Sequence, residues 1–420
     1  MAASATVTNL SQVSATLKEV INDKEIKRQM DVSDIIVGKI KSTSDYATGG
    51  VGRKALVPTT MATNRGGVAR LEGETLGVAG SYTDVNAEYN YKSNYFRFQV
   101  TGQSIASTST DVQALSNVLT RSPKEALLGF GIDISRQVYG TSLGGARIAK
   151  CGTTSASTTV NLDPRTGNNA ITRGWLDVGM WLDIGTAADP DSQSGTGTPV
   201  QITAVTESTT APTITVSSAV TTSSSHFISV YDNRVQADGT SKELTSLNQI
   251  CDASSTIGGL APGTHSKWKG TYDGNSGTLR SISTDTLLSP LNRARQKGAT
   301  PDLIVTSLGV QQKYYTTAFL PATRYIGNAG QDQGDQTGPT FAGMTVNASP
   351  GCPTNQLFIL STDHLAFHVP KGENPNWIPG TDGILHKVAN QDAFEAQGYW
   401  YAELGTNHRA AQVLVDDISE

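Results

Sequence analysis

The stretch from Gly66 to Thr101 limits the possible folds most, because its pattern fits strands that cannot form an ordinary core sheet. Two β-compatible stretches flank a middle rich in Gly, Ser and Asp. In the second stretch Tyr89, Tyr91 and Tyr95 alternate with other residues in a way that leaves both faces semi-polar. Strands without an apolar face do not make a core sheet, and an isolated hairpin is marginal in water. We therefore expect a long protruding ribbon that is stabilised by contacts outside its own fold.

Residues 10–44 have the pattern of an amphipathic helical segment that precedes any obvious core. Its apolar stripe begins with Leu10, Val13, Leu17 and Ile21 and extends more loosely through Ile26, Met30, Ile36 and Ile40. Charged residues occupy the other side, and a Gly-rich break follows the segment. We interpret it as an arm that must bury its stripe against something else, such as another chain.

Composition separates this chain from several classes of protein. Its 420 residues suggest two or three structural units. Charged residues make up 16% of the chain, against about 25% in an average protein, so Ser, Thr, Asn and Gln or neighbouring subunits must cover the surface. The net charge of −5 argues against a general nucleic-acid binder. The sequence predicts no membrane-spanning helix, and its start has neither the basic region nor the apolar region of a secretory signal.

The three cysteines, Cys151, Cys251 and Cys352, lie about a hundred residues apart and form no CxxC pair. This spacing is typical neither of a disulfide framework nor of a zinc site. We expect reduced, packed thiols in a reducing compartment.

The rest of the chain mixes helices and short strands. Helix is predicted in two pieces between 108 and 140, the second starting at a Ser122-Pro123 cap with Glu125 and ending at Gly140. Residues 146–250 contain short alternating runs separated by turn residues, which predict a small antiparallel barrel or sandwich. Residues 278–420 alternate, with a helix over 284–298, a buried strand in DLIVTS, a helix in LGVQQKYYTTAF and further strands. The fold class is α+β.

No catalytic or metal-binding constellation emerges. GTSLG (140–144) matches GxSxG, but a helix precedes the serine where a nucleophile elbow needs a strand. His364 and His368 are four apart in an apparent strand, which places them about 13 Å apart. Asp189, Asp191 and Gln193 hint at a calcium loop, but Ser194 replaces its glycine. We expect a protein that is not an enzyme and that carries no cofactor or metal.

The layout of amphipathic arm, polar ribbon, long helix and α+β body resembles the major capsid protein of a tailed bacteriophage with the Hong Kong 97-type fold. The most specific local similarity is ATPDLIVTSLGVQQKYY followed by FAGMTVNASPGCPTNQLFILSTDHLAFH, which is similar to the helix–strand run of the family's axial domain. The resemblance assigns an N-terminal arm (1–50), a peripheral domain with the spine helix (51–65 and 102–150; helix about 108–140), an E-loop (66–101), a β-rich region with an insertion (151–250), an axial domain (251–385) and C-terminal strands that return to the peripheral domain (386–420).

The resemblance implies self-assembly into the pentamers and hexamers of an icosahedral shell around double-stranded DNA. Its implied partners are other copies of the chain, a scaffolding protein, a portal and decoration proteins, with weak, non-specific contact to the packaged DNA and no membrane. The implied location is the virion, with assembly in the cytoplasm of the host bacterium. An encapsulin-type compartment shell is the alternative within the fold, and a β-rich hydrolase or carbohydrate-binding protein is the alternative from another class.

Three groups of residues are the expected contacts between subunits. The arm should dock through Leu10, Val13, Leu17 and Ile21, and the ribbon should be anchored by Tyr89, Tyr91, Tyr95 and Phe96 and charged by Asp84, Glu88, Lys92 and Arg97. Packing within one chain is the alternative for the aromatic residues. Some relatives join an E-loop lysine to an asparagine of a neighbouring subunit, and Lys92 is the only lysine in the predicted ribbon that could do so.

Overall fold

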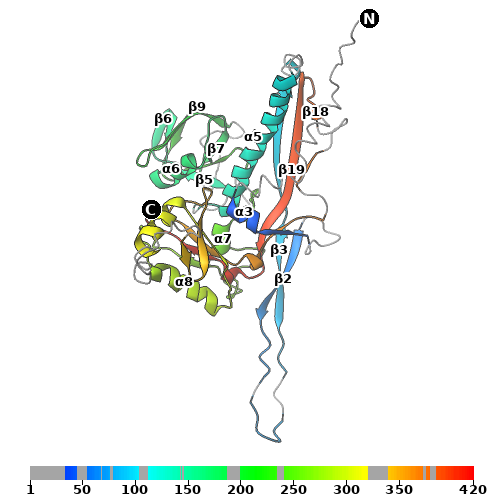
Figure 1. The fold of residues 1–420 in the computed structure, drawn as a ribbon, viewed down its shortest axis with the longest axis vertical. Helices are drawn as coiled ribbons and strands as arrows, with labels where there is room; N and C mark the ends of the chain where they lie inside the picture. Colours follow the sequence, from blue (N-terminus) through cyan, green and yellow to red (C-terminus); the bar gives the residue numbers. More distant parts are fainter. Residues whose placement is uncertain are drawn as a thin grey trace, which may run out of the picture.

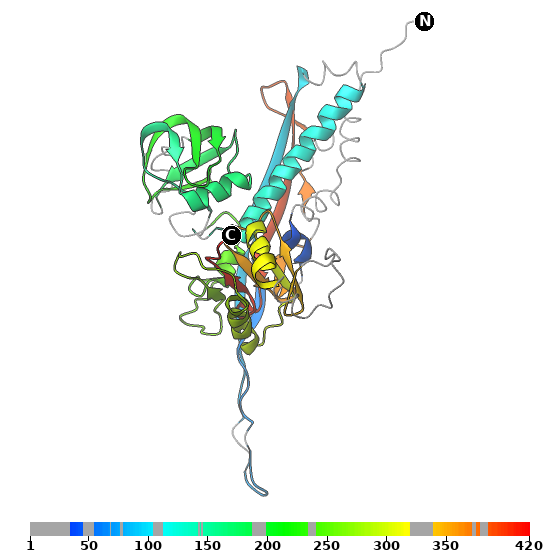
Figure 2. The same cartoon turned by 60° about the vertical axis from the view of Figure 1, so that its left-hand side comes forward.

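The structure, a computed structural model, describes residues 34–44, 54–67, 69–75, 79–103, 112–141, 143, 146–186, 199–233, 241–319, 339–371, 375–378 and 385–420. It is elongated, with a two-stranded ribbon at one end, a long helix beside long strands at the other, and two compact bodies along one side (Figure 1; Figure 2). The predicted arm contacts Leu10, Val13, Leu17 and Ile21 lie outside the described residues, as do Ser142 of the GxSxG match and the Asp189–Ser194 turn.

The longest helix, α5, runs without a break from Val112 to Tyr139. The prediction of two pieces was wrong, because Pro123 lies inside one helix and does not start a second. A proline holds a helical φ and removes one backbone donor, so the helix continues at the cost of one hydrogen bond. The predicted end is confirmed: Gly140 follows the last helical residue with φ +69° and its amide donates to Arg136 O at 2.8 Å.

A long sheet lies against α5 and forms the upper part of Figure 1. Its strands are β1 (Lys41–Thr43), β4 (Lys92–Thr101), β16 (Leu365–His368), β17 (Asn376–Trp377), β18 (Leu385–Lys387) and β19 (Ala393–Thr406). β19 is central, and β4 runs antiparallel to it over ten residue pairs. The apolar side of β4 faces α5, where the ring of Phe96 lies 4.9 Å from the ring of Phe130.

The protruding ribbon consists of β2 (Lys54–Ala62) and β3 (Thr83–Asn90), which are antiparallel. The predicted ribbon, 66–101, therefore had the wrong partners: it omitted β2 and included β4, which pairs with β19. The physical reason is a change of phase between β3 and β4. Ala87 and Tyr89 are buried in β3, whereas Phe96 and Phe98 are buried in β4. Read as one strand, these odd and even positions make both faces look semi-polar, although each strand has one apolar face.

The part of the chain that follows α5 forms a separate β subdomain, which is built on a six-stranded sheet. Its strands are β5 (Arg147–Lys150), β6 (Thr154–Asn161), β7 (Trp181–Gly185), β8 (Val200–Thr206), β9 (Thr213–Thr222) and β10 (Phe227–Val230). All of its strand pairs are antiparallel, which confirms that part of the prediction. An isolated bridge between Cys151 and Leu162 joins its two edges, so the sheet is close to a barrel. Helix α6 (Pro164–Thr172) packs on β5.

The second compact body is a mixed sheet with helices. Its strands are β11 (Thr271–Asp273), β12 (Leu303–Thr306), β13 (Thr340–Phe341), β14 (Met344–Ala348), β15 (Leu357–Leu360) and β20 (Val413–Val415). Its helical elements are α7 (Leu247–Cys251), α8 (Thr284–Gln296), α9 (Leu308–Tyr314), the π-helical turn η1 (Tyr315–Phe319) and the 3-10 turns η2 (Thr362–His364) and η3 (Arg409–Ala411). The predicted helix over 284–298 and the DLIVTS strand are both confirmed.

Two predicted boundaries differ from the strand pairing. Residues 34–43, assigned to the arm, belong to the body: in helix α3 (Ile35–Lys39) Ile36 is fully buried, and β1 pairs with β16. At the other end, 386–420 was expected to return to the peripheral domain as a whole. The end of β18 and all of β19 join the long sheet, whereas β20 pairs with β11 and β15 in the second body.

The described residues also answer two smaller expectations. Cys151, Cys251 and Cys352 are free and buried, as predicted, and burial raises the pKa of each thiol, that of Cys151 to about 12. None of the helices in the described ranges combines the length and the apolar character needed to span a bilayer.

Candidate assembly surfaces

Beyond the paired part of β2 and β3, the described residues between 63 and 82 (63–67, 69–75 and 79–82) form a tip that projects away from the body (Figure 1; Figure 2). Two large side chains there are open to solvent: Leu71 is 77% exposed and Tyr82 is 67% exposed. The two sides of the tip lie close together at Gly66 and Gly80, where a Cβ on Gly66 would lie only 2.3 Å from the backbone nitrogen of Gly80. Large exposed side chains on an extended segment are candidates for burial against another molecule.

Sequence reasoning missed Leu71 and Tyr82 as contact residues. The signal was present, because both are apolar or aromatic residues in a Gly-rich, polar stretch. The tip turns with its own hydrogen bonds, since the Leu71 amide donates to Glu74 Oε2 at 3.0 Å and the Glu74 amide donates to Leu71 O at 3.2 Å.

The base of the ribbon is fixed firmly to the body through Tyr89. Its hydroxyl donates to Thr406 O at 2.7 Å and accepts from the Thr406 amide at 3.1 Å. Its ring stacks on His368 with 5.3 Å between ring centroids. Burial raises the pKa of Tyr89 and lowers that of His368 to about 4. Tyr89 therefore anchors the ribbon within one chain, which matches the alternative of intrachain packing.

The other predicted aromatic contacts divide into buried and exposed residues. Phe96 is buried between Phe130 and Trp377, with ring centroids 4.9 and 5.1 Å away. Tyr91 is partly buried near the ribbon base, and burial raises its pKa. Tyr95 is 58% exposed on β4 and makes an edge-to-face contact with Tyr401. The expectation that all four aromatic residues anchor a protruding ribbon fails for Phe96 and Tyr95, because β4 belongs to the long sheet.

The predicted charged contacts also lie on both strands. Asp84 and Arg97 are exposed, on β3 and β4 respectively. Glu88 on β3 forms an exposed ion pair with Lys54 on β2, at 2.7 Å between Lys54 Nζ and Glu88 Oε2. This pair lies across the two strands of the ribbon, so it supports their register while leaving one carboxylate oxygen near solvent.

Lys92 starts β4 at the body end of the ribbon and is far from the tip in sequence. Its ammonium donates to Ser241 O of the same chain. It also lies near the buried Glu403, whose pKa burial raises to about 7 despite the hydrogen bond from the Thr245 amide and the charge of Lys92. The tip itself, 63–82, contains no lysine. The cross-link thus stays a prediction, and the geometry gives Lys92 a role in its own chain.

A buried ion pair joins the segment before α7 to α5. The guanidinium of Arg136 is 3% exposed and donates to both carboxylate oxygens of Glu243, at 2.6 and 3.0 Å. Asp133 accepts from the same guanidinium at 3.0 Å. Burial would lower the pKa of Arg136, but the charges of Glu243 and Asp133 raise it overall. A buried bidentate pair of this kind fixes geometry, because either charge alone would be left unpaired in the interior.

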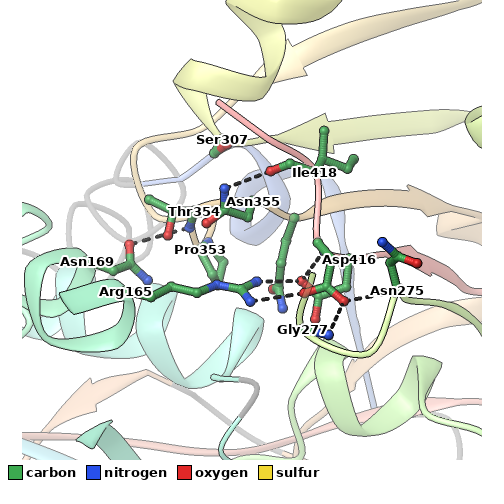
Figure 3. Close-up of polar contacts among 12 residues, drawn as sticks. Arg165, Asn169, Asn275, Gly277, Ser307, Pro353, Thr354, Asn355, Asp416 and Ile418 are labelled. Atoms are coloured by element: carbon green, nitrogen blue, oxygen red, sulfur yellow. Dashed lines mark hydrogen bonds and ion pairs between the residues drawn. The ribbon is translucent and has the colours of Figure 1, made fainter. Parts of the chain in front are cut away.

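The β subdomain and the second body meet at the contact drawn in Figure 3. Arg165 on α6 donates to Asp416 Oδ1 and to Asp417 Oδ1, both at 3.0 Å. Asp417 also accepts from the amides of Asn275 and Gly277 at 2.8 and 2.9 Å. Burial alone would raise the pKa of Asp417, but these amides and Arg165 hold it below its usual value. Arg165 thus links the subdomain to the segment that follows β20.

The β subdomain carries exposed apolar side chains of its own. Trp181 and Tyr231 are each close to half exposed, and the Tyr231 amide donates to Trp181 O at 3.0 Å. Val178, in the turn before β7, is exposed as well. With Leu71 and Tyr82, these are among the large exposed apolar groups of the described residues that a neighbouring molecule could cover.

The described residues hold no group of three His, Cys, Asp or Glu side chains placed to bind a metal ion. His364 lies in η2 and His368 in β16, and they have different neighbours: His364 packs edge-to-face on His408, and His368 stacks on Tyr89. The prediction that both histidines lie in a strand is therefore confirmed for His368 and wrong for His364.

Comparison with solved structures identifies the fold. The chain is similar to the chain in the capsid asymmetric unit of cyanophage A-1(L), with a TM-score of 0.50 and 13% sequence identity over 94% of this chain and 93% of that one. The capsid of myovirus XM1 aligns with a TM-score of 0.43 and 10% identity over 91% of each chain. The encapsulin complex of Synechococcus elongatus aligns with a TM-score of 0.40 and 10% identity over 100% and 93%.

No protein-family model and no curated protein sequence matches the chain. The fold is nevertheless that of the chain in the cyanophage A-1(L) capsid, and it confirms the expected Hong Kong 97-type α+β architecture.

Proposed function

We propose that this chain is the major capsid protein of a tailed phage, and that it assembles into the pentamers and hexamers of an icosahedral head around double-stranded DNA. The observation that carries the proposal is the tip of the ribbon. In a chain with the capsid fold, it projects from the body and exposes Leu71 and Tyr82, although the base of the same ribbon is tightly packed.

The contrast between base and tip supports assembly rather than catalysis. Burying a Leu or Phe-sized side chain contributes about 1.5–3 kcal/mol, and a closed lattice repeats each contact at every subunit. A structural role in the virion is the function that these features support.

The partners follow from this role. The main partner is the same chain, and scaffolding, portal and decoration proteins are the expected additional ones. Contact with packaged DNA is expected to be weak and non-specific, because the chain carries a net charge of −5 and each neutralised phosphate would add salt-dependent affinity.

The test is to shorten the tip without disturbing the base. Because Gly66 and Gly80 already lie close together, residues 67–79 can be replaced by Asn-Gly, a two-residue turn suited to antiparallel strands. The variant keeps β2, β3 and Tyr89. We expect a soluble subunit with unchanged circular dichroism and unchanged thermal unfolding of the isolated subunit that forms no closed particles by negative-stain electron microscopy.

The matched control is Leu71→Ala with Tyr82→Ala in a tip of full length, which should weaken assembly and leave particles at high concentration only. Closed shells of normal size from the shortened variant would contradict the proposal. Particles from producing cells distinguish the two shells with this fold: nuclease-protected DNA supports a phage head, and an enclosed enzyme in place of DNA supports an encapsulin-type compartment.

A further inference from the structure

A cavity of about 660 Å³ lies where the base of the ribbon meets the second body. It is lined by Pro58 to Met61 in the second half of β2 and by Gln296 and Lys297 at the end of α8. Its remaining lining is Ser266, Lys267, Trp268, His364, Asn407, His408 and Ala410. The volume falls in the range of about 300–1,000 Å³ that is typical of small-molecule sites.

The charges around this cavity have one sign. Lys267, Lys297, His364 and His408 line it, and no Asp or Glu does so among the described residues. Asp363, next in sequence to His364, faces Lys41 at 3.6 Å instead. Burial lowers the pKa of Lys297, and the charges of Arg293 and Lys269 lower it further. Lys297 therefore lies among positive charges, although Arg293 and Lys269 do not themselves line the cavity.

The end of α8 is the one feature that opposes an anion here. A helix C-terminus carries about half a negative charge. Its last carbonyl groups are already bonded, since the amides of Lys297 and Ala299 donate to Ala294 O and that of Gly298 donates to Arg295 O. Two full ammonium charges outweigh this half charge.

The two histidines that line the cavity are held in place by neighbouring side chains, so they are positioned to contact a bound anion. His364 and His408 meet edge-to-face with 5.1 Å between ring centroids, and His364 Nδ1 lies 2.8 Å from Asn407 Oδ1. Burial lowers the pKa of His408, and the neighbouring His364 and Lys297 charges lower it further. An anion in the cavity would reverse this effect by favouring the protonated ring.

The cavity also has an apolar part. Pro58, Met61 and Trp268 line it beside the cations, and the indole of Trp268 is fixed by donating to Ile257 O at 3.0 Å. A phosphate group alone is too small to fill the space. A ligand with one phosphate and a flat or apolar group would contact both parts.

We propose that this cavity binds a phosphate monoester of nucleotide size, with Lys267 and Lys297 holding the phosphate and the Pro58–Trp268 side receiving the apolar group. Binding would connect β2 to α8, and so would tie the ribbon base to the second body. This proposal does not depend on the assembly function, because it concerns a cavity within one subunit.

The test is isothermal titration calorimetry of the full chain with adenosine monophosphate, inorganic phosphate and adenosine. We expect the monophosphate to bind more tightly than phosphate and adenosine not to bind measurably. Lys267→Met with Lys297→Met should weaken the monophosphate by about tenfold for each ammonium removed. Lys313→Met, which removes an exposed lysine of α9, is the matched control and should have no effect.

A second measurement on the unmodified protein keeps the proposal testable if the double variant misfolds. Adenosine monophosphate should protect Lys267 and Lys297 from acetylation, read by mass spectrometry, while Lys313 reacts at its usual rate. Equal affinity of the double variant and the parent, or equal reaction of all three lysines with and without ligand, would overturn the proposal. Inorganic phosphate that binds as tightly as the monophosphate would overturn the assignment of the apolar part.

Discussion

The β subdomain and the ribbon are both excursions from the body, but they are stabilised in opposite ways. The subdomain has its own core, in which Ile148, Ile184 and Ile214 are fully or almost fully buried, and its sheet edges meet. The ribbon has a small core only at its base, around Tyr89 and Trp268, and its tip leaves Leu71 in solvent. The subdomain buries a core of its own, whereas the tip of the ribbon leaves large side chains in solvent.

The largest effect should come from opening the core of the subdomain. Ile214→Ala leaves a cavity and should lower the free energy of unfolding by about 2–5 kcal/mol. The matched change at the tip, Leu71→Ala, should leave the free energy of unfolding nearly unchanged, because the Leu71 side chain is exposed and is not packed in a core. Urea denaturation followed by tryptophan fluorescence compares the two, since Trp175 and Trp181 report on the subdomain. Equal loss of stability from both changes would remove the contrast.

A smaller effect should appear in the pH dependence at the ribbon base. Burial raises the pKa of Glu403 to about 7, so the folded state favours its protonated form. This contribution is complete below the ordinary value of about 4.5 and is lost as the pH rises through about 7. Glu403→Gln keeps an acceptor for the Thr245 amide and should gain about 3 kcal/mol over the parent between these limits.

The measurement is the difference in the free energy of unfolding between the two proteins from pH 4.5 to 8. His368, whose pKa is lowered to about 4, changes stability in the opposite direction, because its contribution is lost as the pH falls from 6.5 through 4. It is present in both proteins and so largely cancels in the difference. A difference that does not vary with pH would show that Glu403 is not the titrating group.

The smallest effect should follow from releasing the subdomain from the second body. Arg165→Met removes both charged hydrogen bonds to Asp416 and Asp417 and should cost about 2 kcal/mol. The subdomain keeps its core, so hydrogen exchange should increase around α6 and after β20 but not within β9. Arg165→Lys, which keeps one charge, is the control and should fall between the parent and Arg165→Met. Faster exchange throughout the subdomain would mean that it is not an independent unit.

The sequence predicts local structure well wherever one element suffices to define it. The end of α5 at Gly140, the bounds of α8 and the short strands of the subdomain all follow from capping residues and periodicity. Pairing between distant strands does not, because alternation shows which side of a strand is apolar and not which strand covers it. Tyr89 and Phe96 illustrate this limit. Seven residues apart, they face two different partners, β2 and β19.

The candidate surfaces were predicted only in outline for the same reason. The idea of a protruding ribbon was correct, but the aromatic residues chosen as its contacts include the buried Tyr89 and Phe96. Leu71 and Tyr82 stand out as an apolar and an aromatic residue in a Gly-rich, polar stretch, but they belong to no periodic pattern, so the sequence alone does not show that they lie on a projecting tip. The Arg165 contact joins residues about 250 positions apart and has no local signal.

The bridge between Cys151 and Leu162 matters where many copies of the chain lie close together, because it joins the two edges of the subdomain's sheet. An open sheet edge offers unpaired amides and carbonyl groups to any strand nearby. If many copies of one chain were packed closely together, an open sheet edge on each copy could pair with a strand of a neighbouring copy and form a wrong contact. A subdomain whose sheet edges meet leaves few unpaired backbone groups there, so close packing of many copies would not bring open strand edges together.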